Sequence, residues 1–72
     1  MNWDQIKGEW KDIRGKARAN WGKLTDDDLA HIRGNREQLE AAIQKRYGLA
    51  KEQARQQVDE WTQKLKQLIE TR

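Results

Sequence analysis

The residues best placed to do chemistry are four cations near the start of the chain, separated by four, three and four positions: Lys7, Lys11, Arg14 and Arg18. On a helix this spacing places their side chains on one face, where they form a basic ridge. Trp3 and Trp10 flank the ridge. Such a surface can contact the phosphates of DNA or RNA while the indoles stack on exposed bases. It can equally lie on an anionic membrane or bind a protein partner.

The same residues also have a purely structural interpretation, in which they form a solvated flank whose long side chains cover the indoles. The net charge is +3, and residues 1–24 hold six Lys and Arg against three Asp and Glu, whereas residues 25–72 are neutral. This bias is milder than the dense basic patch of a dedicated nucleic-acid binder. Both interpretations of the ridge therefore stay open.

Catalytic and metal chemistry has few candidate residues in this chain. There is no serine or cysteine, and His31 is the sole histidine. Nucleophilic triads and sites with several His or Cys ligands therefore cannot form within one chain. Asp26, Asp27 and Asp28 are adjacent, whereas a calcium loop needs acidic ligands at alternate positions. We expect no enzyme activity, no metal, no cofactor and no small-molecule substrate.

The ridge must be positioned by the N-terminal segment, which reads as heptads. Large apolar residues and alanine recur at helical spacing and form one stripe: Trp3, Ile6, Trp10, Ile13, Ala17, Trp21 and Leu24. Three glycines, seven residues apart, fall on the opposite side: Gly8, Gly15 and Gly22. The pattern predicts one amphipathic helix that ends at a left-handed cap on Gly22. We expect its stripe to pack in the core, the alternative being an arm that waits for a partner.

Three further helices are predicted after this segment. Thr25 and Asn35 are suitable N-caps for helices that start after them, and Gly48 stops the helix over residues 36–47. The last helix has apolar positions from Ala50 to Ile69. We expect an all-α fold, a compact bundle of four short helices in two crossed helical hairpins, as a single domain over residues 1–72. The predicted core residues are Ile6, Ile13, Leu29, Ile32, Leu39, Ile43, Tyr47, Val58, Trp61 and Leu65.

The composition limits how stable such a domain can be. Charged residues make up 38% of the 72-residue chain and hydrophobic residues 35%, with a mean hydropathy of −1.27. A chain of this length buries only about 60% of its unfolded surface, although the four tryptophans add large apolar areas. No segment has the apolar run of a signal peptide or membrane span. We expect a cytoplasmic monomer.

Beyond composition, an ordered series of segments resembles the CsbD-like family of small bacterial general-stress-response proteins. The matching segments are NWDQIKGEWK at 2–11, WGKLTDDDL at 21–29, IRG at 32–34, IQKRYG at 43–48 and VDEW at 58–61. The resemblance implies a compact bundle of short helices in a cytoplasmic protein made under general or stationary-phase stress. It implies no catalytic residue, cofactor or ligand. The hydrophilic, glycine-containing surface also resembles that of hydrophilins, which implies protection of macromolecules under osmotic stress.

Overall fold

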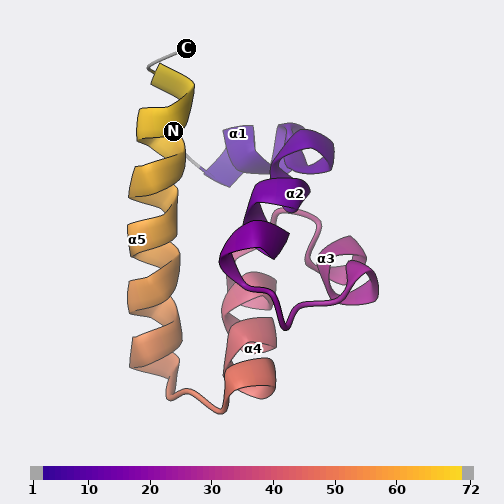
Figure 1. The fold of residues 1–72 in the computed structure, drawn as a ribbon, viewed down its shortest axis with the longest axis vertical. Coiled ribbons are helices and arrows are strands. Elements are labelled where there is room, and N and C mark those ends of the chain that lie inside the picture. Colours follow the sequence, from indigo (N-terminus) through magenta and orange to yellow (C-terminus); the bar gives the residue numbers. More distant parts are fainter. Residues whose placement is uncertain (1–2, 71–72) are drawn as a thin grey trace.

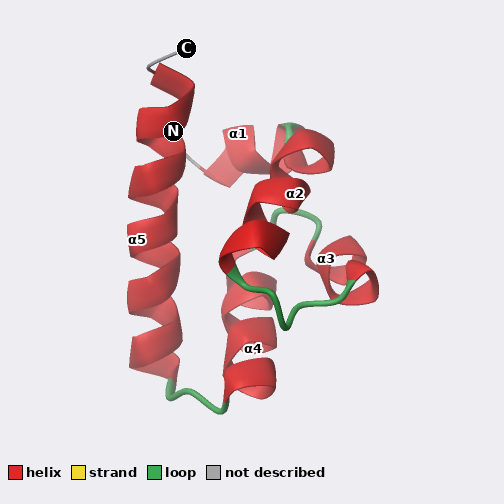
Figure 2. Cartoon of the chain, viewed as in Figure 1, coloured by secondary structure: helices red, strands yellow, loops and turns green. Residues whose placement is uncertain are grey.

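Five helices make up most of the computed structural model, which describes residues 3–70 and the side chains of residues 3–67. In chain order they are α1 (Trp3–Gly8), α2 (Trp10–Asn20), α3 (Asp26–Ile32), α4 (Arg36–Tyr47) and α5 (Lys51–Glu70). Within the described residues there is no strand, so the predicted all-α class is confirmed (Figure 2). The predicted count of four helices is wrong by one. The expected burial of Ile69 lies outside the described side chains.

The helices are arranged around one antiparallel hairpin at the C-terminal end of the chain. α4 and α5 form this hairpin, and α5 is the longest helix (Figure 1). α2 lies in front of α4, α3 packs on α4 on the side away from α5, and α1 lies beside the C-terminal half of α5 (Figure 1). Of the two predicted hairpins, only the second, formed by α4 and α5, is present. The three helices α1, α2 and α3 take the place of the first.

The N-terminal segment is not the single helix that its heptads predict. The chain leaves helical geometry at Glu9, where φ is −109° and ψ is 16°, and α1 and α2 meet at this bend. Gly8 makes the interruption cheap because a glycine stabilises a helix interior by about 1 kcal/mol less than alanine does. The bend turns α1 so that Ile6 is buried and Trp3 packs on Trp61 of α5. Tertiary burial thus outweighs helix continuity at this point.

Local signals set most of the helix ends. The Thr25 hydroxyl accepts a hydrogen bond from the Asp28 N–H, and the Asp28 carboxylate accepts one from the Thr25 N–H, so the predicted cap of α3 is confirmed as a capping box. Asn35 caps α4 as predicted, and Gly48 ends it with φ at 65°. The predicted left-handed cap on Gly22 is wrong, because the C-cap of α2 is Trp21, with φ at −124°, and Gly22 does not have a positive φ.

A single cluster of apolar side chains fills the space between the helices. Its buried members are Ile6, Trp10, Ile13, Ala17, Trp21, Leu24, Leu29, Ile32, Leu39, Ile43, Ala54, Val58, Trp61 and Leu65. Tyr47, expected in the core, is half-buried at the edge, where its hydroxyl oxygen accepts a hydrogen bond from the Lys23 N–H at 3.1 Å. The N-terminal stripe therefore contributes to the same core as α4 and α5 and does not form a separate arm.

The glycines opposite the stripe leave open space, which allows a stability prediction. A Cβ built on Gly15, in the interior of α2, meets nothing within 4 Å, and its φ is not positive. Gly15→Ala is therefore expected to raise the free energy of unfolding by about 1 kcal/mol, because alanine is the better helix former. For a domain of this size the midpoint of thermal unfolding rises by about 4–8 °C. An unchanged or lower midpoint by circular dichroism would contradict this prediction.

Candidate functional site

Trp10, a predicted part of the binding surface, lies in the core. Only 8% of the residue is exposed, and its indole N–H donates a hydrogen bond to the Leu29 carbonyl oxygen at 2.9 Å. That carbonyl lies in the last turn of α3 and also accepts a hydrogen bond from the Arg33 N–H at 3.3 Å. Trp10 thus joins α2 to α3, and its ring cannot stack on a base. Its assignment to the binding surface is corrected.

The other three tryptophans meet between α1, α2 and α5. The Trp21 and Trp61 ring centroids are 5.2 Å apart, and the Trp3 and Trp61 centroids are 6.5 Å apart. The Trp21 indole N–H donates to the Gln57 side-chain oxygen at 3.0 Å. Trp3 remains half-buried and is the most accessible of the four. The cluster packs the N-terminal helices against α5 and offers no free aromatic face beside the basic ridge.

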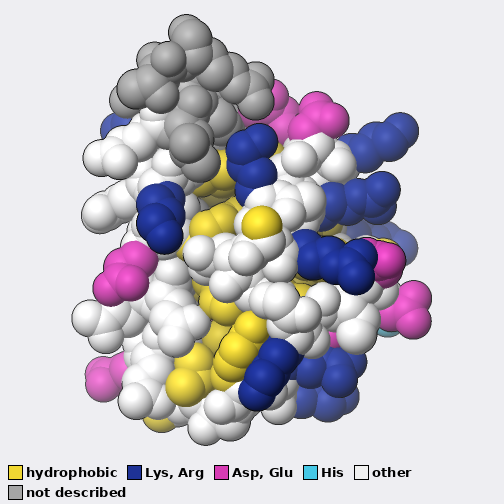
Figure 3. All heavy atoms as spheres, viewed as in Figure 1, with side chains coloured by type: hydrophobic (Ala, Val, Ile, Leu, Met, Phe, Trp, Pro, Cys, Tyr) yellow, Lys and Arg dark blue, Asp and Glu magenta, His cyan; other side chains and the backbone are white. Residues whose placement is uncertain are grey.

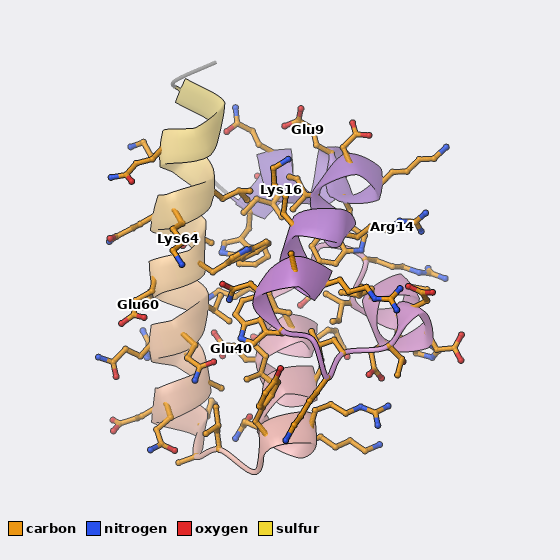
Figure 4. The ribbon with its side chains drawn as sticks, in the orientation of Figure 1. Glu9, Arg14, Lys16, Glu40, Glu60 and Lys64 are labelled. Carbon is orange, nitrogen blue, oxygen red and sulfur yellow. The ribbon has the colours of Figure 1, made fainter. Side chains whose placement is uncertain are left out.

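The structure separates the four cations of the predicted ridge. Lys11, Arg14 and Arg18 lie on α2 and line one hollow of about 560 Å³ between α2 and α3. Lys7 lies on α1, beyond the bend, and does not line this hollow. In Figure 4 the Arg14 side chain points away from α5, and Figure 3 shows Lys and Arg side chains gathered on that side of the molecule. We call Lys11, Arg14 and Arg18 the α2 basic surface.

Two carboxylates line the same hollow and offset part of its positive charge. Asp12 belongs to α2, and Asp26 begins α3. An Arg18 guanidinium nitrogen lies 2.5 Å from a carboxylate oxygen of Asp26, with side-chain exposures of 56% and 81%. Exposed ion pairs of this kind contribute about 0–1 kcal/mol to stability. The pair can therefore open at little cost when another anion approaches Arg18.

A second charged cluster, which the sequence alone does not predict, has a structural role. The Arg36 guanidinium donates hydrogen bonds to Glu40 on α4, at 2.8 Å, and to Asp59 on α5. Its central carbon lies 6.0 Å from the centroid of the Trp3 ring on α1. The hydrogen bond to the mostly buried Glu40 carboxylate raises the pKa of Arg36. In the sequence, only the four-residue spacing of Arg36 and Glu40 indicates that these two side chains can pair on one helix face.

Asp28 carries the ionisation that depends most clearly on the fold. Its carboxylate accepts two hydrogen bonds from Arg46, at 2.8 and 3.1 Å, and one from the Thr25 N–H. The Arg46 hydrogen bonds, followed by the one from Thr25, lower the pKa of Asp28 to about 2. Asp28, in the acidic run at residues 26–28, thus completes the cap of α3 and also forms an ion pair with Arg46 of α4, a contact that the sequence does not predict.

This lowered pKa predicts how stability responds to acid. The stabilisation by ionised Asp28 is complete above its unfolded pKa of about 3.9 and is lost as the pH falls through about 2. We expect about 1–2 kcal/mol of the unfolding free energy to disappear over this range. Arg46→Gln should reduce this loss of stability in acid. The control, Lys45→Gln, removes the exposed positive charge next to Arg46 and should leave the loss unchanged. Urea titrations at a series of pH values measure it, and equal acid sensitivity in both variants would contradict the assignment.

The rest of the surface is polar and lacks grouped metal ligands in the part of the chain that the structure describes. No group of three or more His, Cys, Asp or Glu side chains there is arranged so that it could hold a metal ion. No helix among the described residues has the length and apolarity needed to cross a membrane. Over residues 3–67, the exposed hydrophobic residues are all alanines: Ala19, Ala30, Ala41 and Ala50.

One apolar seam is visible from outside, between α2 and α5 (Figure 3). Trp61 and Leu65 lie at its floor but are only 4% and 1% exposed. Lys16 of α2 and Lys64 of α5 lie on either side of it (Figure 4). The seam is therefore nearly closed by its own walls, and it offers little apolar area to a ligand.

These features define a small all-helical protein with a tryptophan-containing core and a charged exterior. The family model described as CsbD-like matches residues 4–56, and the chain belongs to this family. It is 56% identical over 61 residues to UPF0337 protein ECA0631 of Pectobacterium atrosepticum, covering 85% of this chain and 88% of that protein. It is 51% identical over 61 residues to UPF0337 protein YjbJ of Salmonella typhimurium, covering 85% and 87%. It is 52% identical over 66 residues to UPF0337 protein RPA4217 of Rhodopseudomonas palustris, covering 92% and 100%.

Proposed function

We propose that this protein is a non-catalytic bacterial stress-response protein that protects other macromolecules through its hydrated, charged exterior. The observation that carries the proposal is the exposure pattern, because alanines are the only exposed hydrophobic residues over residues 3–67. Large exposed apolar patches usually mark docking sites. A surface without them stays hydrated and resists self-association when the protein is concentrated. Membership of the CsbD-like family supports the stress-response part of the proposal.

The proposal includes action in the cytoplasm, as a monomer. It differs from a purely disordered hydrophilin in one respect, because the protective exterior is held by a packed core. The fold buries three of the four tryptophans and half-buries Trp3, which limits their contact with client proteins. In an unfolded chain of this composition the same rings would be free to associate with clients or with each other. We therefore expect protection to depend on the folded state.

Drying a labile multisubunit enzyme, such as lactate dehydrogenase, in the presence of the protein tests this proposal. We expect the enzyme to recover more activity after rehydration than it does with an equal mass of serum albumin. Replacing Lys11, Arg14 and Arg18 together with glutamine should leave this protection intact, because the rest of the exterior stays charged. Recovery no better than with albumin would contradict a protective role.

A further inference from the structure

The α2 basic surface offers positive charge to an anion and no apolar contact. Its three cations lie on one helix and face one hollow, and each side chain is exposed. Among the side chains that the structure describes, Leu29 is the one apolar residue that lines the hollow, and it is 2% exposed. Beneath this surface the Trp10 indole is occupied by its hydrogen bond to Leu29. Within residues 3–67, no apolar or aromatic side chain is therefore exposed to a ligand at this hollow.

Because the surface offers charge but no apolar or aromatic contact, it suits some anionic partners better than others. Binding at a membrane interface relies on apolar side chains that enter the acyl boundary, and the hollow presents none. Binding of single-stranded nucleic acid relies on aromatic rings on which unpaired bases stack, and the nearby ring is buried. A duplex keeps its bases stacked inside and presents its phosphates outward. Contacts to phosphates need only exposed cations, which this surface does present.

We infer that the α2 basic surface binds the phosphodiester backbone of double-stranded nucleic acid without reading its sequence. Lys11 and Arg18 are seven residues apart, which is about 10 Å along the helix axis, and Arg14 lies between them. A duplex carries one negative charge per about 1.7 Å of its axis, so the three cations span several phosphates. Gly15 adds no side chain to this hollow, and a Cβ there would meet nothing within 4 Å.

The two carboxylates of the hollow limit how strong this contact is. Arg18 must exchange its exposed partner Asp26 for a phosphate, and Asp12 remains close by. Three phosphate contacts give a slope of about −2.7 for the logarithm of the binding constant against the logarithm of salt concentration. A tenfold rise in salt should therefore weaken binding about 500-fold. The inference goes beyond the protective function, which needs no specific partner and has a different readout.

Fluorescence anisotropy of labelled duplexes of about 20 base pairs, from about 20 to 200 mM salt, tests the inference. The first variant replaces Lys11, Arg14 and Arg18 with glutamine. The control variant replaces the same number of exposed cations on α5, Lys51, Arg55 and Lys66, so that the net charge falls equally. We expect the first variant to lose at least tenfold in affinity at low salt and most of the salt slope, and the control to change less than threefold. Circular dichroism checks that both variants remain folded.

Several outcomes would overturn the inference. Equal losses in the two variants would show that only net charge matters, and tighter binding to a single strand of the same length would show base stacking. Binding to phosphatidylserine vesicles without binding to duplexes would assign the surface to membranes. Two duplexes of unrelated sequence should bind within twofold of each other, and a strong preference for either would contradict backbone recognition. Duplex RNA is expected to bind within a few-fold of duplex DNA, and failure of both duplexes to bind at low salt would refute the inference outright.

Discussion

Replacing Trp10 with alanine is expected to lower the free energy of unfolding by about 3–5 kcal/mol. The residue is 8% exposed and packs between α2 and α3, so the change leaves a large cavity at the centre of the N-terminal half. It also removes the indole N–H from the Leu29 carbonyl oxygen. Domains are stabilised by about 0.05–0.15 kcal/mol per residue, so the loss is a large share of the total. Urea denaturation followed by circular dichroism measures it.

Trp10→Phe provides the matched control for that experiment. Phenylalanine keeps most of the buried area but cannot donate to Leu29, whose carbonyl oxygen still accepts from the Arg33 N–H at 3.3 Å. The control should therefore lose about 1–2 kcal/mol, the scale of one buried hydrogen bond and a small cavity. If Trp10→Ala instead leaves stability unchanged, the ring is not part of the core and Trp10 returns to the candidate binding surface.

The sequence predicts those parts of the fold that depend on neighbouring residues. Helix N-caps at Thr25 and Asn35 and the stop at Gly48 each involve contacts within three or four positions. Apolar residues at helical spacing likewise identify the buried face of α2 without knowledge of its partners. These predictions hold because an amphipathic face must pack against something, and in a chain this short the same core is available to every helix.

The errors arise where distant segments meet. The bend at Glu9 depends on the packing of Trp3 of α1 on Trp61 of α5. Neither heptad spacing nor helix propensity can predict a contact between residues so far apart in the sequence. Once the bend is present, Lys7 leaves the ridge and the candidate site becomes the α2 basic surface. The sequence places Trp10 both in the core stripe and beside the ridge, because a helical projection does not show how far a ring at the boundary is covered. Its acceptor on Leu29 is 19 residues away.

Gly34→Ala is the second substitution with a large expected effect, because two costs add at this residue. Gly34 has φ at 76°, which costs a residue with a Cβ about 1–2 kcal/mol. A Cβ there would also lie 2.6 Å from the Lys7 Cα and 3.1 Å from the Lys7 backbone nitrogen. The turn between α3 and α4 rests on the α1 backbone at this point, and backbone atoms cannot rotate out of the way. Separating them should cost about 1–3 kcal/mol more.

Gly48→Ala isolates the first of these costs. Gly48 has φ at 65°, and a Cβ there meets nothing within 4 Å, so only the backbone strain remains. Urea denaturation should give a loss of about 1–2 kcal/mol for Gly48→Ala and about 2–5 kcal/mol for Gly34→Ala. Asparagine tolerates left-handed geometry, so Gly48→Asn should be nearly neutral while Gly34→Asn stays destabilising. Equal losses at the two glycines would mean that the contact with Lys7 relaxes freely. A larger loss at Gly34 would show that this glycine lets the α3–α4 turn hold α1 in its bent position.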